Sequence, residues 1–249
     1  MAGVSLLRSA LADAWALVAP VDCAGCGAHD RALCALCAAT LHSRLMHATL
    51  EVDGSALPLV AALPYEGVAR RALLALKHEG RTELARPLAR PLLDAVTAAW
   101  HRAAPELIVT VPGSRAGAAR RGFGPVALMA RRAGLVTVPA LRAVAAGPEQ
   151  KALRLEQRLA TDATRWHASP CVAGRRVLLV DDVVTSGGTL RAATRALRAA
   201  GAEVAACAAL AATVRRWGES SIHWKFFGAD DEGHGDNAAR EYYREGKEA

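Results

Sequence analysis

Residues 177–189 read Val-Leu-Leu-Val-Asp-Asp-Val-Val-Thr-Ser-Gly-Gly-Thr, and their chemical character changes three times within this stretch. The apolar run at 177–180 is typical of a strand that is buried on both faces of a parallel sheet. Two adjacent carboxylates, Asp181 and Asp182, end that run. From Thr189 onward, apolar residues recur at helical spacing until Gly201, where a glycine commonly closes a helix. The stretch therefore predicts a strand, a turn and a helix of an α/β fold.

The turn between that strand and that helix is suited to binding an anion. Free backbone N–H groups and the positive end of a helix dipole meet at a helix N-terminus, and small residues let a phosphate approach closely. The turn consists of Thr185, Ser186, Gly187, Gly188 and Thr189. Asp181 and Asp182 would repel a phosphate, but carboxylates accept hydrogen bonds from sugar hydroxyls or hold Mg²⁺ through water. The combination predicts a site for a sugar 5′-phosphate.

This order of features resembles the 5-phosphoribosyl-1-pyrophosphate (PRPP) signature of type I phosphoribosyltransferases. A dinucleotide-binding fingerprint and a P-loop both fit poorly, because Gly-x-Gly-x-x-Gly and the P-loop lysine are missing from the stretch. The alternative is that Asp182 only caps a helix and that the glycines only make a tight turn. The resemblance implies a doubly wound parallel α/β sheet with its ligand at the carboxyl ends of the strands.

A second motif lies near the N-terminus, where Cys23, Cys26, Cys34 and Cys37 form two Cys-x-x-Cys pairs that are separated by seven residues. Four thiolates in this spacing match a tetrahedral structural zinc site. Two disulfides or a redox pair are the alternatives. Small zinc modules often present a docking surface, so a protein or nucleic-acid partner is expected for this one.

A narrower resemblance extends along much of the chain. Its segments are Tyr65-Glu66-Gly67 with Arg70, Arg71, Leu73, Leu74, Leu76, Lys77 and Gly80, then Arg120-Arg121-Gly122-Phe123, and finally Gln150, Leu153 and Arg158. Together with the four cysteines, these segments resemble the ComF family over roughly residues 20–213. Gly124 departs from the family pattern, in which Asn usually follows the Phe.

The resemblance implies further parts of a PRPP site. A strand is expected at 107–111, and the turn after it would hold the pyrophosphate through Gly113, Ser114 and Arg115; a plain surface turn is the alternative. Residues 149–160 would form a mobile loop that closes over PRPP and excludes water, with Arg158 as a catalytic candidate. A charged surface helix is the alternative for that loop.

The pair Arg120 and Arg121 is a further candidate for phosphate contacts. The planar guanidinium group matches phosphate oxygens geometrically, so either arginine could meet the substrate.

Charge is unevenly distributed along the 249 residues, whose net charge is +7. The segment from Trp217 onward carries four basic and eight acidic residues, which leaves +11 for residues 1–216. A basic body suits a polyanion, although a solvated arginine-rich face explains such charge more often. No apolar run reaches the length of a membrane span, and Arg8 and Asp13 interrupt the N-terminal stretch that would otherwise read as a signal peptide. The expected location is the cytoplasm.

These features divide the chain into four parts. They are an amphipathic helix at 1–19, the zinc module at 20–48, a phosphoribosyltransferase-like domain at 49–214, and an acidic, aromatic-containing tail at 215–249 whose composition is typical of disorder. The other elements expected within the domain are helices at 68–77 and 125–132, one or two helices at 83–103 interrupted by Pro87 and Pro91, and strands at 57–63 and 204–213.

The function expected from these features is Mg²⁺-dependent transfer of a phosphoribosyl group. A nucleophile would displace pyrophosphate from C1 of PRPP through an oxocarbenium-like transition state. The sequence does not identify the acceptor. Two other functions are consistent with the same motifs: a single-stranded DNA-binding protein of competence and DNA uptake, as the resemblance to ComF implies, and a regulator that senses PRPP.

Overall fold

The computed structural model describes residues 21–29, 31–113, 117, 119, 121–143, 166–213, 222 and 224–226. Several predictions fall outside these residues and are not addressed by the structure. They are the helix at 1–19, Ser114, Arg115, Arg120, the covering loop with Gln150, Leu153 and Arg158, and most of the tail at 215–249.

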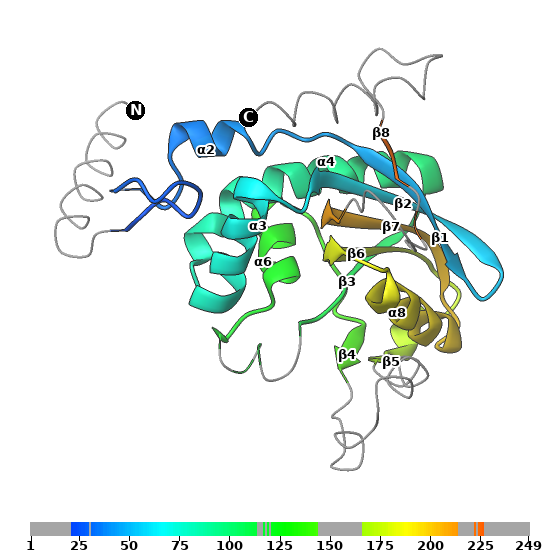
Figure 1. The fold of residues 1–249 in the computed structure, drawn as a ribbon. Helices are drawn as coiled ribbons and strands as arrows, with labels where there is room; N and C mark the ends of the chain where they lie inside the picture. The colour runs from blue at the N-terminus through cyan, green and yellow to red at the C-terminus, as the bar shows by residue number, and fades with distance from the viewer. Residues whose placement is uncertain are drawn as a thin grey trace, which may run out of the picture.

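A six-stranded sheet forms the centre of the structure (Figure 1). Its parallel strands, in spatial order, are β3 (Leu107–Thr110), β6 (Arg176–Val184), β7 (Glu203–Ala212) and β2 (Ser55–Pro64). Two antiparallel strands, β1 (Met46–Val52) and β8 (Lys225–Phe226), follow β2 and complete the order β3-β6-β7-β2-β1-β8. The carboxyl ends of the parallel strands therefore lie along one edge of the sheet, which is the mostly parallel α/β architecture predicted from the sequence.

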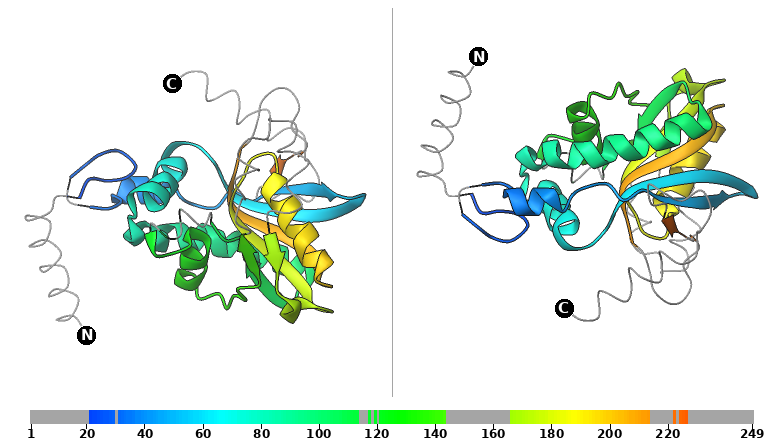
Figure 2. Two further views of the ribbon diagram at one scale, coloured as in Figure 1. Left: turned by 90° about the horizontal axis from the view of Figure 1, so that it is seen from below. Right: turned by 90° about the horizontal axis from the view of Figure 1, so that it is seen from above.

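Helices cover both faces of this sheet, as Figure 2 shows. The helix α4 (Ala85–Ala103) lies along one face, with α3 (Gly67–Leu74) and α6 (Pro125–Arg132) beside it, and α8 (Gly188–Ala199) covers the other face. Strand β6 supplies residues to both layers: Leu178 and Val180 pack in the core under α4, whereas Val177 and Leu179 pack under α8. All four side chains are fully buried. This two-sided burial explains the continuous apolar run of the sequence.

The chain from 85 to 103 forms one continuous helix, α4, which corrects the interruption expected at its two prolines. Pro87 lies in the first turn, where backbone N–H groups have no partner within the helix, so its missing donor breaks no helical bond. Pro91 lies within the helix and is buried in the core beside Leu88 and Leu92. Packing of this apolar side outweighs the loss of one backbone hydrogen bond.

A hairpin of β1 and β2 lies beside β7, and the sequence expectations include only its second strand. Asp53 and Gly54 form the connection, with φ values of 50° and 78°, as a two-residue hairpin turn requires. On its other side β1 pairs with β8, so residues 225–226 of the expected tail are part of the sheet. Ile222, which precedes β8, is buried.

Shorter elements connect these layers. They are α2 (Ala35–Ala39), the π-helical turn η1 (Ala75–Glu79), the 3₁₀ turns η2 (Thr82–Leu84) and η5 (Pro170–Val172), and the antiparallel pair β4 (Leu141–Ala143) and β5 (Trp166–Ala168). Within the described part of the chain, no helix has both the length and the apolar character that crossing a membrane would require.

Candidate functional site

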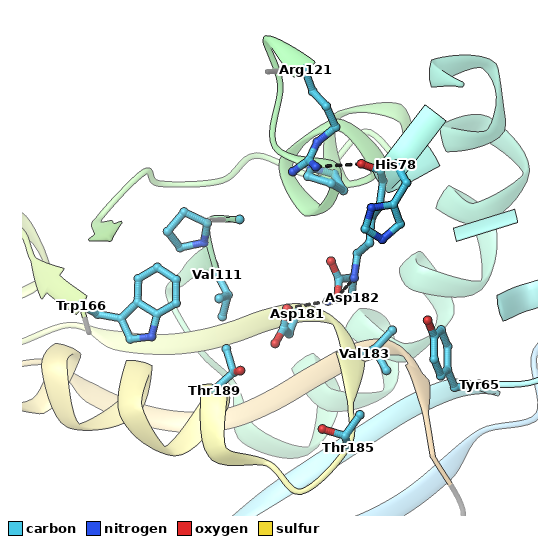
Figure 3. Close-up of a pocket in the computed structure, with 14 residues that line it drawn as sticks. Tyr65, His78, Val111, Arg121, Trp166, Asp181, Asp182, Val183, Thr185 and Thr189 are labelled. Atoms are coloured by element: carbon cyan, nitrogen blue, oxygen red, sulfur yellow. Dashed lines mark hydrogen bonds and ion pairs between the residues drawn. The ribbon is translucent and has the colours of Figure 1, made fainter. Parts of the chain in front are cut away.

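A cleft of about 430 Å³ opens where β3 and β6 end (Figure 3). It is lined by Tyr65, Lys77, His78, Val111, Pro112, Gly113, Arg121, Pro125, Trp166, Asp181, Asp182, Val183, Thr185 and Thr189. The fold therefore brings together both predicted carboxylates, both threonines of the predicted phosphate turn and the first residue of the predicted pyrophosphate turn. The sequence analysis assigns no site role to three of these lining residues, Tyr65, His78 and Trp166. Tyr65 belongs to a family segment, but no sequence signal points to Trp166.

The two carboxylates of β6 differ in their surroundings. Asp181 is buried, with 6% of its surface exposed, and its Oδ1 accepts a hydrogen bond of 2.8 Å from the backbone N–H of Asp182. The Oδ1 of Asp182 accepts a hydrogen bond of 2.7 Å from Nζ of Lys77 in η1. The N-cap of α8 is Gly187, so Asp182 does not cap that helix and the capping alternative is wrong.

The turn after β6 brings the N-terminus of α8 to the cleft. Gly187 adopts a φ of 78° as N-cap, and α8 begins at Gly188. Ser186 is exposed, whereas Gly187 is buried. A Cβ atom on Gly187 would lie 2.7 Å from Cδ1 of Leu50 and 2.8 Å from Cδ1 of Ile222. A side chain is therefore excluded here by both backbone conformation and packing. The unpaired N–H groups expected in the first turn of α8 suit an anion.

Arg121 links the residues that follow β3 to η1, the helical turn that carries Lys77 and lines one side of the cleft. Its Nη1 donates a hydrogen bond of 2.7 Å to the backbone carbonyl of Lys77, and its Nη2 lies 3.4 Å from the position that a Cβ atom would take on Gly113. The buried Nε of Arg121 has no hydrogen-bond partner within the described residues. A buried, unsatisfied donor of this kind is unusual in a folded protein.

The four predicted metal ligands converge on one point. The sulfur atoms of Cys23, Cys26, Cys34 and Cys37 all lie within 4.8 Å of one another, and those of Cys26 and Cys34 are 3.7 Å apart. Tetrahedral zinc with bonds of about 2.3 Å requires sulfurs about 3.8 Å apart. All four cysteines are free thiols, and their convergence into one cluster argues against two separate disulfides. The cluster is compatible with zinc.

Backbone donors surround the sulfurs of this cluster. The N–H groups of Gly25 and Cys34 donate to the sulfur of Cys23 over 3.4 Å and 3.3 Å, and the N–H of Cys37 donates to the sulfur of Cys34 over 3.4 Å. Burial raises the pKa of Cys23, but these and neighbouring backbone hydrogen bonds outweigh it and lower that pKa to about 6. A thiolate is the form that binds a metal, so the loop favours the liganding state of Cys23.

Comparison with known proteins agrees with this arrangement. A family model described as "Phosphoribosyl transferase domain" matches residues 116–237, which include β6, the carboxylates and α8. The sheet has the α/β architecture typical of type I phosphoribosyltransferases. The chain therefore carries a phosphoribosyltransferase domain, and a four-cysteine cluster precedes it.

Individual relatives are enzymes that act on different bases. The chain is 37% identical over 114 residues to an adenine phosphoribosyltransferase of Sphingopyxis alaskensis, covering 46% of this chain and 56% of that protein. It is 36% identical over 127 residues to an adenine phosphoribosyltransferase of Streptomyces galbus, covering 51% of this chain and 66% of that protein. It is 74% identical over 35 residues to an orotate phosphoribosyltransferase of Nocardioides sp., covering 14% of this chain and 20% of that protein. In each case the match spans less than two thirds of the relative.

Proposed function

We propose that this protein is a Mg²⁺-dependent phosphoribosyltransferase that transfers the phosphoribosyl group of PRPP to an acceptor and releases pyrophosphate. The main support is one observation: Asp181, Asp182, Thr185 and Thr189 line a single cleft at the carboxyl ends of parallel strands. A sugar phosphate placed there meets hydrogen-bond acceptors for its hydroxyls on one side and a helix N-terminus for its 5′-phosphate on the other.

The proposed roles follow from these chemical differences. Asp181 and Asp182 accept hydrogen bonds from the ribose hydroxyls and hold Mg²⁺, which would help to neutralise the departing pyrophosphate. The 5′-phosphate is bound by the backbone and hydroxyl groups of the turn at 185–189. Gly113 also lines the cleft, and the pyrophosphate is proposed to bind there together with Ser114 and Arg115. Arg121 adds a guanidinium group beside Gly113. Arg158 retains its proposed role in a covering loop.

Release of pyrophosphate provides the test of this function. The purified protein would be incubated with PRPP and Mg²⁺ and with adenine, orotate, other nucleobases and simple amines in turn. We expect release with at least one acceptor, dependence on Mg²⁺, and loss of release in the double variant Asp181→Asn/Asp182→Asn. Release no greater than that of the double variant would refute the enzymatic function for the acceptors used.

The four-cysteine cluster is proposed to hold structural zinc. Cys23, Cys26, Cys34 and Cys37 would fill all four positions of a tetrahedral ion, so no position is left for a substrate or a reactive water. The ion would fix the loops around it and leave the chemistry to the cleft. A site of four thiolates requires reduced cysteines, and the cytoplasm keeps thiols reduced. The cluster therefore supports the proposed cytoplasmic location.

A second candidate is a non-catalytic protein that binds single-stranded DNA and belongs to the ComF family. The sequence resemblance supports it, as does the basic body with +11 net charge over residues 1–216. A regulator that binds PRPP without turnover is a variant of the same idea. DNA binding that weakens steeply with salt and persists in Asp181→Asn/Asp182→Asn, without pyrophosphate release by the wild type, would favour this candidate.

A further inference from the structure

Lys77 reaches into the cleft from a part of the chain far from the phosphoribosyltransferase signature. Its Nζ lies 2.7 Å from Oδ1 of Asp182, across 105 positions of sequence. The side chains of Lys77 and Asp182 are only 24% and 15% exposed. A charge-assisted bond that is shielded from water in this way is stronger than an exposed surface ion pair.

The backbone around Lys77 is built to hold it in this place. Residues 75–79 form a π-helical turn, a departure from regular helix that is frequent at functional sites, and Gly80 closes the turn with a φ of 72°. The carbonyl of Lys77, which lies near the C-terminus of the helix, accepts the bond from Arg121. Leu76 beside it is completely buried. Both the backbone and the ammonium group of Lys77 are therefore fixed.

The charge of the acidic pair explains why such a residue is useful. Two adjacent carboxylates would repel a sugar that carries phosphates at both ends. The hydrogen bond from the backbone N–H of Asp182 to Oδ1 of Asp181 comes from a neutral group, so it adds no positive charge to the acidic pair. Lys77 compensates one of them, because its ammonium group is in direct contact with Asp182. Among the described residues, the only group bonded to the carboxylate of Asp182 is Nζ of Lys77 at Oδ1, which leaves Oδ2 for a ligand.

We propose that Lys77 positions Asp182 and neutralises its charge, so that the cleft binds a sugar phosphate even without a divalent cation. This inference rests on the proposed binding of PRPP. Lys77 acts through Asp182 and is a positioning residue, since no contact of Lys77 with the substrate is required. When Mg²⁺ is present, the cation supplies part of the same neutralisation.

Ribose 5-phosphate is the probe, with affinity measured by calorimetry in EDTA and in saturating Mg²⁺. We expect Lys77→Met to weaken binding by about tenfold or more in EDTA and by clearly less in Mg²⁺. In an Asp182→Asn background, the same Lys77→Met change should alter affinity by less than about twofold, because the charge to be neutralised is gone. Thermal unfolding checks that each variant is folded, and Lys77→Gln replaces Lys77→Met if the latter is not.

Arg195→Met is the matched control, because it also removes one positive charge from an ion pair. Its partner is Asp53, on the β1–β2 hairpin, and neither residue lines the cleft. We expect this control to bind ribose 5-phosphate with wild-type affinity in both conditions.

Three results would overturn the inference about Lys77: wild-type affinity of Lys77→Met in EDTA, an equal loss with and without Mg²⁺, or a full loss that persists in the Asp182→Asn background. If the wild-type protein binds neither ribose 5-phosphate nor PRPP, the proposed function fails instead. Binding by the wild type with any of the three results refutes the role of Lys77 alone.

Discussion

Replacing Gly187 with alanine should weaken both folding and phosphate binding, because one added methyl group meets two separate obstacles. The φ of 78° at Gly187 is left-handed, which costs an L-residue about 1–2 kcal/mol. The new Cβ would also lie 2.7 Å from Leu50 and 2.8 Å from Ile222. Both contact atoms are side-chain ends, but Leu50 is fully buried and Ile222 is 2% exposed, so neither can turn into solvent. Overpacking of this kind adds about 1–3 kcal/mol.

Gly54 offers a control that separates the two costs. Its φ is also 78°, but a Cβ atom there would have nothing within 4 Å. Gly54→Ala should therefore lose only about 1–2 kcal/mol of unfolding free energy, from backbone conformation. The difference between Gly187→Ala and Gly54→Ala then measures the packing against Leu50 and Ile222. Urea unfolding followed by circular dichroism gives both free energies.

Ligand affinity and a compensating change complete this test. Ribose 5-phosphate should bind more weakly to Gly187→Ala, because relief of the contact displaces the N-terminus of α8, and should bind normally to Gly54→Ala. The variant Ile222→Ala removes one of the two clashing atoms. The free energy of unfolding that is lost through Gly187→Ala should therefore be smaller when the change is made in the Ile222→Ala background than in the wild type. Equal destabilisation by Gly187→Ala and Gly54→Ala, within about 0.5 kcal/mol, would refute the packing argument.

Two further predictions concern the cysteine cluster and the hairpin. A Cβ atom on Gly25 would lie 2.5 Å from the sulfur of Cys37. Gly25→Ala should therefore reduce the zinc content of the purified protein well below one ion per chain. Elemental analysis that shows the wild-type zinc content would contradict this prediction. Hydrogen bonds from Arg195 lower the pKa of Asp53 in the folded protein. The pair therefore stabilises the fold fully above the unfolded-state pKa of about 3.9. This stabilisation is lost as the pH falls through the lower pKa of Asp53 in the folded state. Asp53→Asn should therefore be less stable than the wild type at pH 7 and equally stable at pH 2, and a stability gap that stays constant between these values would contradict the role of the pair.

Local patterns account for the parts of the fold that the sequence predicts well. The run at 177–180 is apolar at every position because β6 is buried on both sides, and Gly201 ends α8 with a φ of 84°. The helix at 125–132 is confirmed to the residue, since Pro125 marks its first turn. The four cysteines are also recognisable, because their spacing alone is specific for a shared site. In each case the information lies within a few neighbouring residues.

The parts that the sequence does not predict depend on distant partners. Strand β1 is an exception, because its residues Met-His-Ala-Thr-Leu-Glu-Val alternate between apolar and polar as in a half-buried strand, a pattern that the sequence expectations do not use. The dipeptide Asp53-Gly54 is a hairpin signal that could have revealed it. Lys77 has a weaker signal: the helical pattern alone reads it as a solvated charge, and only its place in the segment that resembles the ComF family draws attention to it. Only the folded chain brings it to Asp182, 105 positions further along the sequence.

The contacts of Arg81 connect the cysteine cluster to the wall of the cleft. Its Nη2 donates to the backbone carbonyl of Asp22 over 2.7 Å and to that of Ala32 over 3.3 Å, so it holds both sides of the cysteine loops. Arg81 directly follows Gly80, which ends the helical turn that carries Lys77. On the other side of that wall, Lys77 is bonded to Asp182 of β6. A structural ion that fixes the cysteine loops would therefore also restrict the movement of Lys77, although no cysteine lines the cleft. This chain of contacts gives a physical reason for the four-cysteine cluster and the proposed substrate cleft to occur in one protein, although no cysteine takes part in the cleft.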